Sequence, residues 1–254
     1  MTQDNHDAMP CRLKGRIALI TGGSRGQGAA HARRLAQEGA HVLAVDILDD
    51  EGTALARTLQ VENLDVTYRH LNVTRKDEWT ALHDHLADIH GKLDILVNNA
   101  GIVHISTIED ETPETWQHIL NVNLSGAFLG LQSMIPLLRK SGHASVINTS
   151  SIFGPSGAPG YSAYATSKAG LLGFSRTAAL ELAADGIRVN ALVPGGVRTP
   201  LNAAEKEGGV IPETPLRRRA TPQELAAAVA FLASDDASFM TGAELVVDGG
   251  FSAR

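Results

Sequence analysis

Short apolar runs alternate along this chain with longer segments in which apolar residues recur at helical spacing. The runs are rich in Val, Ile and Leu, and several end in Gly, Asn or Asp, a pattern typical of buried parallel strands that stop at a turn. The expected strands are residues 16–23, 41–46, 66–73, 93–101, 144–151, 187–196 and 242–250.

The segments between these runs show the period of helices. The expected helices are residues 28–40, 51–59, 76–91, 114–142, 164–186 and 221–234. The last of these begins with Thr221 as a cap and Pro222 in the first turn, which favours a helix start. The alternation predicts an α/β fold: one doubly wound parallel sheet of about seven strands, joined by right-handed crossovers, with helices on both faces.

Composition narrows the class of protein. The 254 residues suit one domain, expected at residues 13–254 after a flexible lead at residues 1–12. The formal net charge of -6 argues against a nucleic-acid partner and against an anionic membrane surface. No apolar run approaches the ~18 residues that a membrane span needs. The single cysteine, Cys11, excludes a disulfide within the chain, and together with the absence of a signal-peptide pattern it predicts a cytoplasmic protein.

A tyrosine and a lysine are the first candidates for chemistry. Tyr164 and Lys168 are four residues apart in a predicted helix, so they share one face. A free phenol has a pKa of ~10, but an ammonium ~4 Å away at an effective dielectric of ~20 favours the phenolate by ~4 kcal/mol, about three pKa units. The pair therefore predicts a tyrosine that exchanges protons near neutral pH, with the Ser151 hydroxyl beside the same substrate oxygen. An exposed i, i+4 pair of side chains on a solvated helix is the alternative explanation.

A glycine-rich turn follows the first expected strand. The segment TGGSRGQG (21–28) carries Gly22, Gly26 and Gly28 between a predicted strand and a predicted helix. Such a turn lets the backbone approach a pyrophosphate that sits at the helix N-terminus. A tight strand–helix connection without a ligand would give the same glycines.

The residue that ends the second expected strand bears on the choice of cofactor. A carboxylate at Asp46 can bind both hydroxyls of an adenosine ribose and repels a 2′-phosphate, although a turn-forming Asp is the alternative. Arg25 points the other way, because a basic residue can hold that phosphate. Asp46 decides the prediction, since a phosphate with up to two negative charges cannot settle beside an unneutralised carboxylate. NAD is therefore expected.

Taken together, the motifs resemble those of the short-chain dehydrogenase/reductase family over about residues 13–251. The matching segments are TGGSRGQG (21–28), NNAG (98–101), NVNLSGAF (121–128), NTSS (148–151), YATSK (164–168), RVNALVPGGVRTP (188–200) and TGAELVVDGG (241–250). The resemblance implies a single Rossmann-type, NAD-binding catalytic domain in which a segment at about residues 197–220 covers the substrate.

The family's catalytic set falls on Asn123, Ser151, Tyr164 and Lys168. The resemblance assigns Tyr164 as the proton donor or acceptor and Ser151 as the group that polarises the substrate oxygen. It also implies that Lys168 binds the nicotinamide ribose and lowers the pKa of the tyrosine. Asn123 is expected to hold a water that links Lys168 to solvent.

The expected cofactor and substrate residues lie mainly after strand ends. The cofactor set is Gly22, Ser24, Arg25, Gly26, Gln27, Gly28, Asp46, Ile47, Asn72, Val73, Asn99, Ala100, Gly101, Val122, Tyr164, Lys168, Pro194, Gly195, Val197 and Thr199. The substrate set is Ser151, Ile152, Phe153, Tyr161 and Tyr164. Two positions depart from the family pattern: Gln27 replaces the usual Leu or Ile, and Asn72 replaces a frequent Asp at the adenine edge. Asn99 has an alternative role in stabilising the sheet.

The expected activity is an NAD-dependent interconversion of a secondary alcohol and a ketone. The likeness is to bacterial hydroxysteroid and secondary-alcohol dehydrogenases, which implies a bulky hydrophobic substrate that is hydroxysteroid-like, cyclic or aromatic. It also implies a homotetramer built from helices 114–139 and 164–183 and the C-terminal strand. The alternatives are an NADPH-dependent 3-oxoacyl-thioester reductase and a non-catalytic NAD-binding sensor.

Three other patterns are set aside. The cluster of His83, Asp84, His85 and His90 lacks the spacing of known metal motifs, so no metal site is expected. The basic run at residues 217–219 is interpreted as a solvated or salt-bridged loop edge in an acidic chain. No G-x-S-x-G elbow accompanies Ser151, which argues against a hydrolase.

Overall fold

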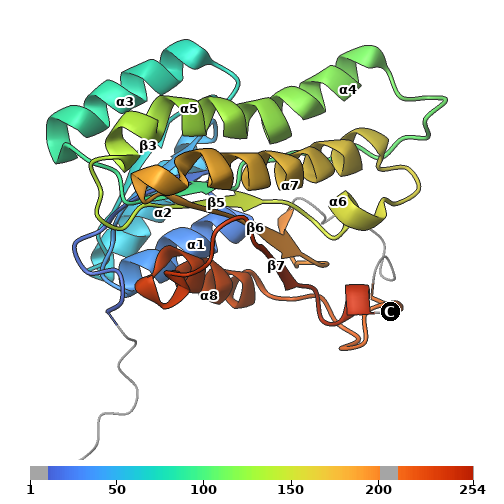
Figure 1. Ribbon diagram of the computed structural model, residues 1–254. Coiled ribbons are helices and arrows are strands. Elements are labelled where there is room, and N and C mark those ends of the chain that lie inside the picture. Colours follow the sequence, from blue (N-terminus) through green and yellow to red (C-terminus); the bar gives the residue numbers. More distant parts are fainter. Residues whose placement is uncertain (1–10, 201–210, 254) are drawn as a thin grey trace, which may run out of the picture.

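The apolar runs of the sequence form one parallel sheet (Figure 1). The computed structural model describes residues 11–200 and 211–253. Its strands are β1 (Ile17–Thr21), β2 (His41–Asp46), β3 (Val66–His70), β4 (Ile95–Asn98), β5 (Ser145–Thr149), β6 (Arg188–Pro194) and β7 (Glu244–Val247). They are ordered β3-β2-β1-β4-β5-β6-β7, and every neighbouring pair is parallel. The predicted doubly wound sheet is confirmed, and its strand order reverses between β1 and β4.

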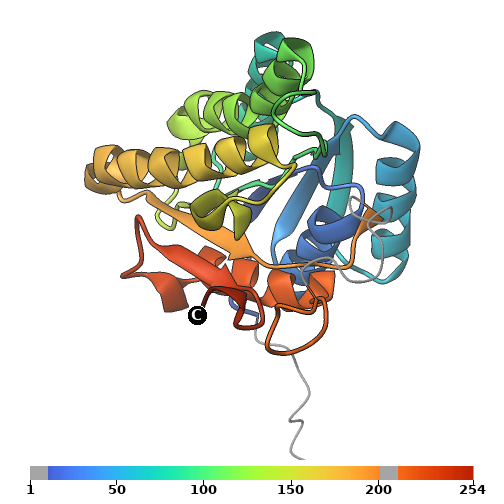
Figure 2. The same ribbon diagram turned by 90° about the vertical axis from the view of Figure 1, so that its right-hand side faces the viewer.

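Helices cover both faces of this sheet (Figures 1 and 2). The helices are α1 (Gly26–Gln37), α2 (Asp49–Val61), α3 (Lys76–His90), α4 (Pro113–Leu120), α5 (Gly126–Leu138), α6 (Phe153–Ser156), α7 (Ser162–Leu182) and α8 (Pro222–Ala233). Helices α3, α4, α5 and α7 lie on one face, and α1, α2 and α8 lie on the other. At the start of α8, the Glu224 carboxylate accepts a hydrogen bond from the Thr221 backbone N–H, so the predicted cap at Thr221 is confirmed.

The two faces of the sheet bury separate cores because successive side chains on a strand point in opposite directions. On β1, Leu19 packs into the core beneath α3, α5 and α7, which includes the fully buried Trp79. Its neighbour Ile20 packs into the core beneath α1, α2 and α8, together with Leu35. Burial on both faces explains why the inner strands β1, β2 and β4 form nearly continuous apolar runs, whereas the edge strands β3 and β7 are partly exposed.

The expected helix at residues 114–142 contains a π-helical turn. This turn, Asn121–Ser125, lies between α4 and α5. The buried Asn123 amide accounts for the position of this turn, because it bonds to another part of the chain. Its Oδ1 accepts from the Ile102 N–H at 2.8 Å, and its Nδ2 donates to the Ile102 carbonyl at 2.9 Å and to Ser167 Oγ at 3.0 Å. The helical run is continuous over residues 113–138, so the predicted long helix is confirmed, and the π-helical turn inside it is a detail that hydrophobic period alone cannot reveal.

A chain of buried amides and hydroxyls ties α7 to the sheet. Asn98 Nδ2 donates to Asn148 Oδ1 across β4 and β5 at 2.8 Å, and Asn148 Nδ2 donates to Ser175 Oγ on α7 at 2.8 Å. All three residues are buried, so each hydrogen bond is costly to break. This chain fixes how far α7 is rotated about its axis, and it thereby sets which residues of α7 point to the strand ends.

Two regions of the sequence prediction fall partly outside the described residues. Residues 1–10 belong to the expected lead, and residues 201–210 belong to the expected substrate segment. At the border of the lead, Arg12 donates to Glu38 at 2.8 Å and pairs with Asp236 at 2.9 Å. Across the described ranges, no helix combines the length and apolar character needed to cross a membrane.

One buried histidine has a consequence for acid stability. His31 on α1 is fully buried, and neither of its ring nitrogens has a hydrogen-bond partner among the described residues. Burial without a partner disfavours the imidazolium and lowers the pKa of His31 to about 3. The folded protein therefore keeps this ring neutral at pH values at which the unfolded chain protonates it.

We expect the free energy of unfolding to fall as the pH drops below 6.5, because only the unfolded state then binds the proton. With a folded pKa of about 3, this single group accounts for a loss of about 2 kcal/mol between pH 8 and pH 5. Denaturant unfolding of wild type and His31→Leu at both pH values measures this loss. The variant should lose about 2 kcal/mol less than wild type; equal losses would contradict the assignment.

Candidate active site

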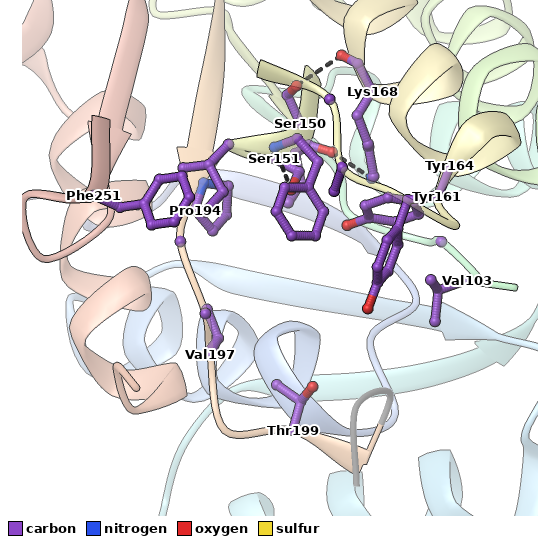
Figure 3. A pocket seen from close by; sticks show the side chains of 18 of the residues that line it. Val103, Ser150, Ser151, Tyr161, Tyr164, Lys168, Pro194, Val197, Thr199 and Phe251 are labelled. Atoms are coloured by element: carbon purple, nitrogen blue, oxygen red, sulfur yellow. Dashed lines mark hydrogen bonds between the residues drawn. The ribbon is translucent and has the colours of Figure 1, made fainter. Parts of the chain in front are cut away.

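Two cavities open beyond the carboxyl ends of the strands. The larger, of about 660 Å³, contains Tyr164 and Lys168 on its wall (Figure 3), and the smaller, of about 290 Å³, contains Asp46. Four residues line both cavities, namely Gln27, Asn99, Gly101 and Thr199. The cavities therefore form one elongated cleft that crosses the sheet where the strand order reverses, the position at which open α/β sheets bind their ligands.

The glycine turn shapes the smaller cavity, because its glycines allow close backbone contacts that a residue with a Cβ atom would prevent. Gly22 has φ +62°, and a Cβ there would lie 2.8 Å from Ala100 Cα. A Cβ on Gly28 would lie 2.0 Å from the Gly22 carbonyl oxygen, so helix α1 sits directly against the turn. Gly26, the first residue of α1, lines the smaller cavity. A helix N-terminus at this wall suits the diphosphate of a dinucleotide.

The Asn99 side chain holds this turn in place. Its Nδ2 donates to the carbonyls of Thr21 and Gly22 at 3.0 and 3.1 Å. The Thr21 hydroxyl in turn accepts the backbone N–H of Asn99 at 3.0 Å. These bonds show the structural role predicted for Asn99. Because Asn99 also lines the cleft, a contact with the cofactor stays a prediction.

Asp46 presents a carboxylate that is held by backbone donors. Its Oδ2 accepts from the Ser24 N–H at 3.1 Å, and its Oδ1 accepts from the Ile47 N–H at 2.8 Å. Arg25 is exposed and lines the same cavity. Ser24 and Gly28 belong to the predicted cofactor set but line neither cavity; their contacts support Asp46 and the turn.

The predicted adenine-edge residue is already engaged. Asn72 Oδ1 accepts from the backbone N–H of Thr74 at 3.0 Å and from its hydroxyl at 2.8 Å. The side chain therefore closes a local turn, while the residue still lines the smaller cavity beside Val73. The predicted residues Ile47, Ala100 and Val122 line this cavity too, and Pro194, Gly195 and Val197 line the larger one.

Tyr164 and Lys168 lie on the same face of α7, as their spacing predicts. Lys168 Nζ is 5.6 Å from the centroid of the Tyr164 ring and donates a hydrogen bond of 2.7 Å to the carbonyl of Thr149 at the end of β5. Burial of the lysine, which is 4% exposed, lowers its pKa from 10.5 to about 8. The ammonium is therefore still the main form at neutral pH, next to the phenol whose ionised form it favours.

The predicted substrate residues form a connected wall of the larger cavity (Figure 3). The rings of Phe153 and Tyr161 lie 4.9 Å apart, and those of Tyr161 and Tyr164 lie 6.1 Å apart. Ser151 Oγ accepts from the Phe153 backbone N–H at 3.2 Å, which leaves its own proton for a substrate oxygen. Ile152 completes this wall.

Asn123 lies behind the site rather than on its surface, because it lines neither cavity. It is nevertheless close to the lysine: a Cβ on Gly101 would be 3.4 Å from both Asn123 Oδ1 and Lys168 Nζ. The amide is engaged by Ile102 and Ser167, so its direct effect is to fix the backbone around the lysine. The expected water between Asn123 and Lys168 stays a prediction.

Several wall residues were missed in the sequence. The larger cavity is also lined by Val103 and Ile105 from the loop after β4, by Glu213, and by Phe251 near the C-terminus. His118 on α4 borders the smaller cavity. These positions carry no motif, and only the strand order brings their loops together, so nothing local could have indicated them.

The histidine cluster and the basic run, to which the sequence analysis assigned no function, contain residues that form local ion pairs in the structure. His83 Nδ1 lies 3.0 Å from Asp84 Oδ1 on the surface of α3, and Arg218 pairs with Glu224 at 2.7 Å. The interpretation of the basic run as a salt-bridged loop edge is confirmed for Arg218. Within the described ranges, no group of three or more His, Cys, Asp or Glu side chains is arranged to hold a metal ion.

Comparison with known proteins shows to which family the chain belongs. A family model with the description enoyl-(acyl carrier protein) reductase, which represents short-chain dehydrogenases/reductases, matches residues 22–252. The chain belongs to the short-chain dehydrogenase/reductase family. It is therefore an oxidoreductase that uses a nicotinamide cofactor, and the resemblance seen in the motifs is confirmed.

Similar proteins match nearly the whole chain. A 3-alpha-(or 20-beta)-hydroxysteroid dehydrogenase of Mycobacterium tuberculosis is 46% identical over 95% of this chain and 91% of the relative. A trans-4-hydroxycyclohexanecarboxylate dehydrogenase of Sinomonas cyclohexanicum is 42% identical over 95% of each chain. A cyclopentanol dehydrogenase of Comamonas is 38% identical over 96% of this chain and 99% of the relative.

A solved structure shows the same fold. A gluconate 5-dehydrogenase from Burkholderia cenocepacia, in complex with NADP and tartrate, superimposes with a TM-score of 0.92 at 32% identity, covering 98% of this chain and 100% of that one. The cleft of the present structure fits a dinucleotide of this kind by its own features. It has glycines where backbone must approach closely, a helix N-terminus at mid-length, and a buried Gln27 Oε1 without a partner among the described residues.

The buried lysine gives a prediction about alkaline stability. Between pH 8 and pH 10.5 the unfolded chain keeps the Lys168 proton that the folded protein releases, so the free energy of unfolding should rise with pH. For a folded pKa of about 8 the gain between pH 7 and pH 10 is about 2.5 kcal/mol. Unfolding of wild type and Lys168→Met at both pH values should show this gain in wild type alone. Parallel pH profiles would refute the perturbed lysine.

Proposed function

We propose that this protein is an NAD-dependent dehydrogenase/reductase that interconverts a secondary alcohol and a ketone on an uncharged, bulky cyclic substrate. One observation carries the proposal. Tyr164, Lys168 and Ser151 meet on the wall of a cavity of about 660 Å³, and this cavity continues into a second one that ends at Asp46. The first cavity has room for a ring substrate beside a nicotinamide, and the second for an adenosine.

The residues divide the work as follows. A bound nicotinamide supplies the hydride chemistry. In the oxidation direction Tyr164 takes the proton of the substrate hydroxyl, and in reduction it returns that proton to the ketone oxygen. Ser151 donates a hydrogen bond to the same oxygen. The Lys168 ammonium favours the tyrosinate and binds the nicotinamide ribose, and Asn123 holds the surrounding backbone and the water through which the proton reaches solvent.

The walls of the larger cavity support an uncharged cyclic substrate. Apolar and aromatic side chains surround the space, namely Val103, Ile105, Ile152, Phe153, Tyr161 and Phe251. Among its described lining residues the only cation is Lys168, which is buried and bonded to the Thr149 carbonyl. The only carboxylate among them is Glu213. A substrate carboxylate would find no accessible counter-ion in this lining, whereas a neutral ring fits it.

The preference for NAD rests on Asp46. Backbone N–H groups of Ser24 and Ile47 hold its carboxylate at the smaller cavity, where it can accept both hydroxyls of an adenosine ribose. Arg25 lines the same cavity, and the B. cenocepacia gluconate 5-dehydrogenase structure, 32% identical, contains NADP. A fixed carboxylate beside a 2′-phosphate outweighs one exposed arginine, so we assign NAD to this chain.

Two rival functions are less well supported. A reductase of acyl thioesters with NADPH agrees with the description of the matching family model, but Asp46 opposes its cofactor. A cofactor-binding sensor without catalysis would not need Ser151, Tyr164 and Lys168 to meet at one cavity. We also propose a cytoplasmic homotetramer. The apolar side chains of Phe128 on α5 and Leu180 on α7, 46% and 83% exposed, support an interface on these helices.

The substrate assignment predicts discrimination by charge. We expect cyclohexanol and cyclopentanol to be oxidised with a kcat/KM at least about 10-fold higher than trans-4-hydroxycyclohexanecarboxylate, because each factor of ten needs only about 1.4 kcal/mol of unfavourable burial. Steady-state kinetics with NAD measures the ratio. Tyr164→Phe serves as the background and should lower turnover by about 10²–10⁴-fold. A faster carboxylate would overturn the assignment of an uncharged substrate, and an active Tyr164→Phe would overturn the mechanism.

The cofactor assignment predicts a switch at one carboxylate. Wild type should prefer NAD over NADP by about 100-fold or more in kcat/KM, since a loss of about 3 kcal/mol accompanies a phosphate beside a fixed negative charge. Asp46→Asn keeps the shape and removes the charge, so it should narrow the preference at least about 10-fold. Arg25→Ala in that background should weaken NADP specifically. An unchanged ratio in Asp46→Asn would show that Asp46 does not choose the cofactor.

A further inference from the structure

Gln27 is a half-buried residue whose amide oxygen is buried with an unmet hydrogen bond in the cleft. It is the second residue of α1 and one of the residues that line both cavities. Its Oε1 is buried and has no hydrogen-bond partner among the described residues. A buried amide oxygen without a donor destabilises the fold, so its persistence in a binding cleft points to a donor on the ligand.

None of the neighbouring described groups donates to Gln27 Oε1 in this structure. The Asn99 side-chain N–H groups already bond to the carbonyls of Thr21 and Gly22. Lys168 Nζ donates to the carbonyl of Thr149. The remaining wall that both cavities share consists of Gly101, which has no side chain, and Thr199, whose hydroxyl makes no hydrogen bond to Gln27 Oε1. A molecule that fills the cleft is thus the source of a donor that the geometry favours.

A nicotinamide dinucleotide offers few donors at this point. If the adenosine lies by Asp46 and the nicotinamide by Tyr164, the junction at Gln27 faces the diphosphate and the nicotinamide nucleoside. Diphosphate oxygens accept hydrogen bonds and cannot satisfy another acceptor. The donors left are the ribose hydroxyls, which the proposed function places at Lys168, and the NH₂ of the carboxamide; the ligands below separate the two.

We propose that Gln27 Oε1 accepts a hydrogen bond from the carboxamide NH₂ of the nicotinamide, and that Gln27 is thereby a cofactor-recognition residue. The inference rests on the proposed placement of the nicotinamide beside Tyr164. An aliphatic residue at this position could pack under the cofactor but could not bind the amide. Gln27 therefore fixes the rotation of the carboxamide, and with it the ring face that meets the substrate.

Three ligands separate this bond from other effects of the side chain. NAD⁺ carries the carboxamide, 3-acetylpyridine adenine dinucleotide replaces its NH₂ with a methyl group, and ADP-ribose lacks the ring. Dissociation constants are measured by calorimetry on wild type and on Gln27→Leu, with Gln27→Met as a second apolar variant in case Leu impairs folding. Thermal melting checks that each variant is folded.

We expect both variants to bind NAD⁺ about 5–10-fold more weakly than wild type, with little change for the acetylpyridine analogue or ADP-ribose, because a hydrogen bond in a dry site is worth that factor. The ratio of affinities for NAD⁺ and the analogue should then fall by the same factor. Equal weakening of NAD⁺ and the analogue would overturn the proposal and indicate packing or a ribose contact.

Equal weakening of all three ligands would also overturn it, and would show that Gln27 only supports the glycine turn. These outcomes leave the proposed function intact. Failure of wild type to bind any dinucleotide would instead remove the proposed function and this inference together.

Discussion

The site depends on one buried ammonium that is bonded to the end of a central strand. Lys168 is almost inaccessible to water, and its Nζ donates to the carbonyl of Thr149 where β5 stops. This bond fixes the lysine relative to the sheet, and α7 then places Tyr164 one turn earlier on the same face. Burial makes the charge costly, which is why the fold must hold it so firmly. The same burial makes it effective, because little water screens it from the phenol.

The rest of the molecule can be understood as the support for that arrangement. The hydrogen-bonded chain from Asn98 through Asn148 to Ser175 sets the rotation of α7 against β4 and β5. The π-helical turn brings the Asn123 amide to the backbone of Ile102 and to Ser167, the residue before the lysine. Polar contacts in a core cost stability unless each member is satisfied. The side-chain amide N–H groups of Asn98 and Asn148 find partners in this chain, whereas Asn98 Oδ1 has none among the described residues.

Much of this design is visible in the sequence, because it depends on local pattern. The alternation of short strand patterns with helical ones locates the strands, and the i, i+4 spacing by itself places Tyr164 and Lys168 on one face of a helix. The glycine turn is recognisable because its conformation and close contacts allow only glycine. Asp46 is recognisable as a candidate because it is the last residue of the second apolar run, which forms β2.

The missing parts depend on contacts between distant segments. The π-helical turn around Asn123 depends on a hydrogen bond from Ile102, which lies 21 positions earlier in the chain. The hydrophobic period of the helix therefore does not indicate this turn. The short helix α6 lies within a stretch rich in Gly and Pro, between the expected strand at 144–151 and the expected helix at 164–186, where the sequence predicted no helix. Val103, Ile105 and Phe251 reach one cavity because β4 and β7 end at the same edge of the sheet. The order of the strands in the sheet determines which loops meet at the cavity, and no local sequence pattern at these residues indicates that order.

The wall shared by the two cavities has a practical consequence for redesign. Gln27, Asn99, Gly101 and Thr199 face both spaces, so enlarging the room for substrate at any of them also disturbs the seat of the dinucleotide. Val103, Ile105 and Phe251 border the larger space alone. Mutant libraries that aim at new alcohol substrates should vary these three side chains. Substitutions there can change substrate selectivity while the affinity for the coenzyme stays constant.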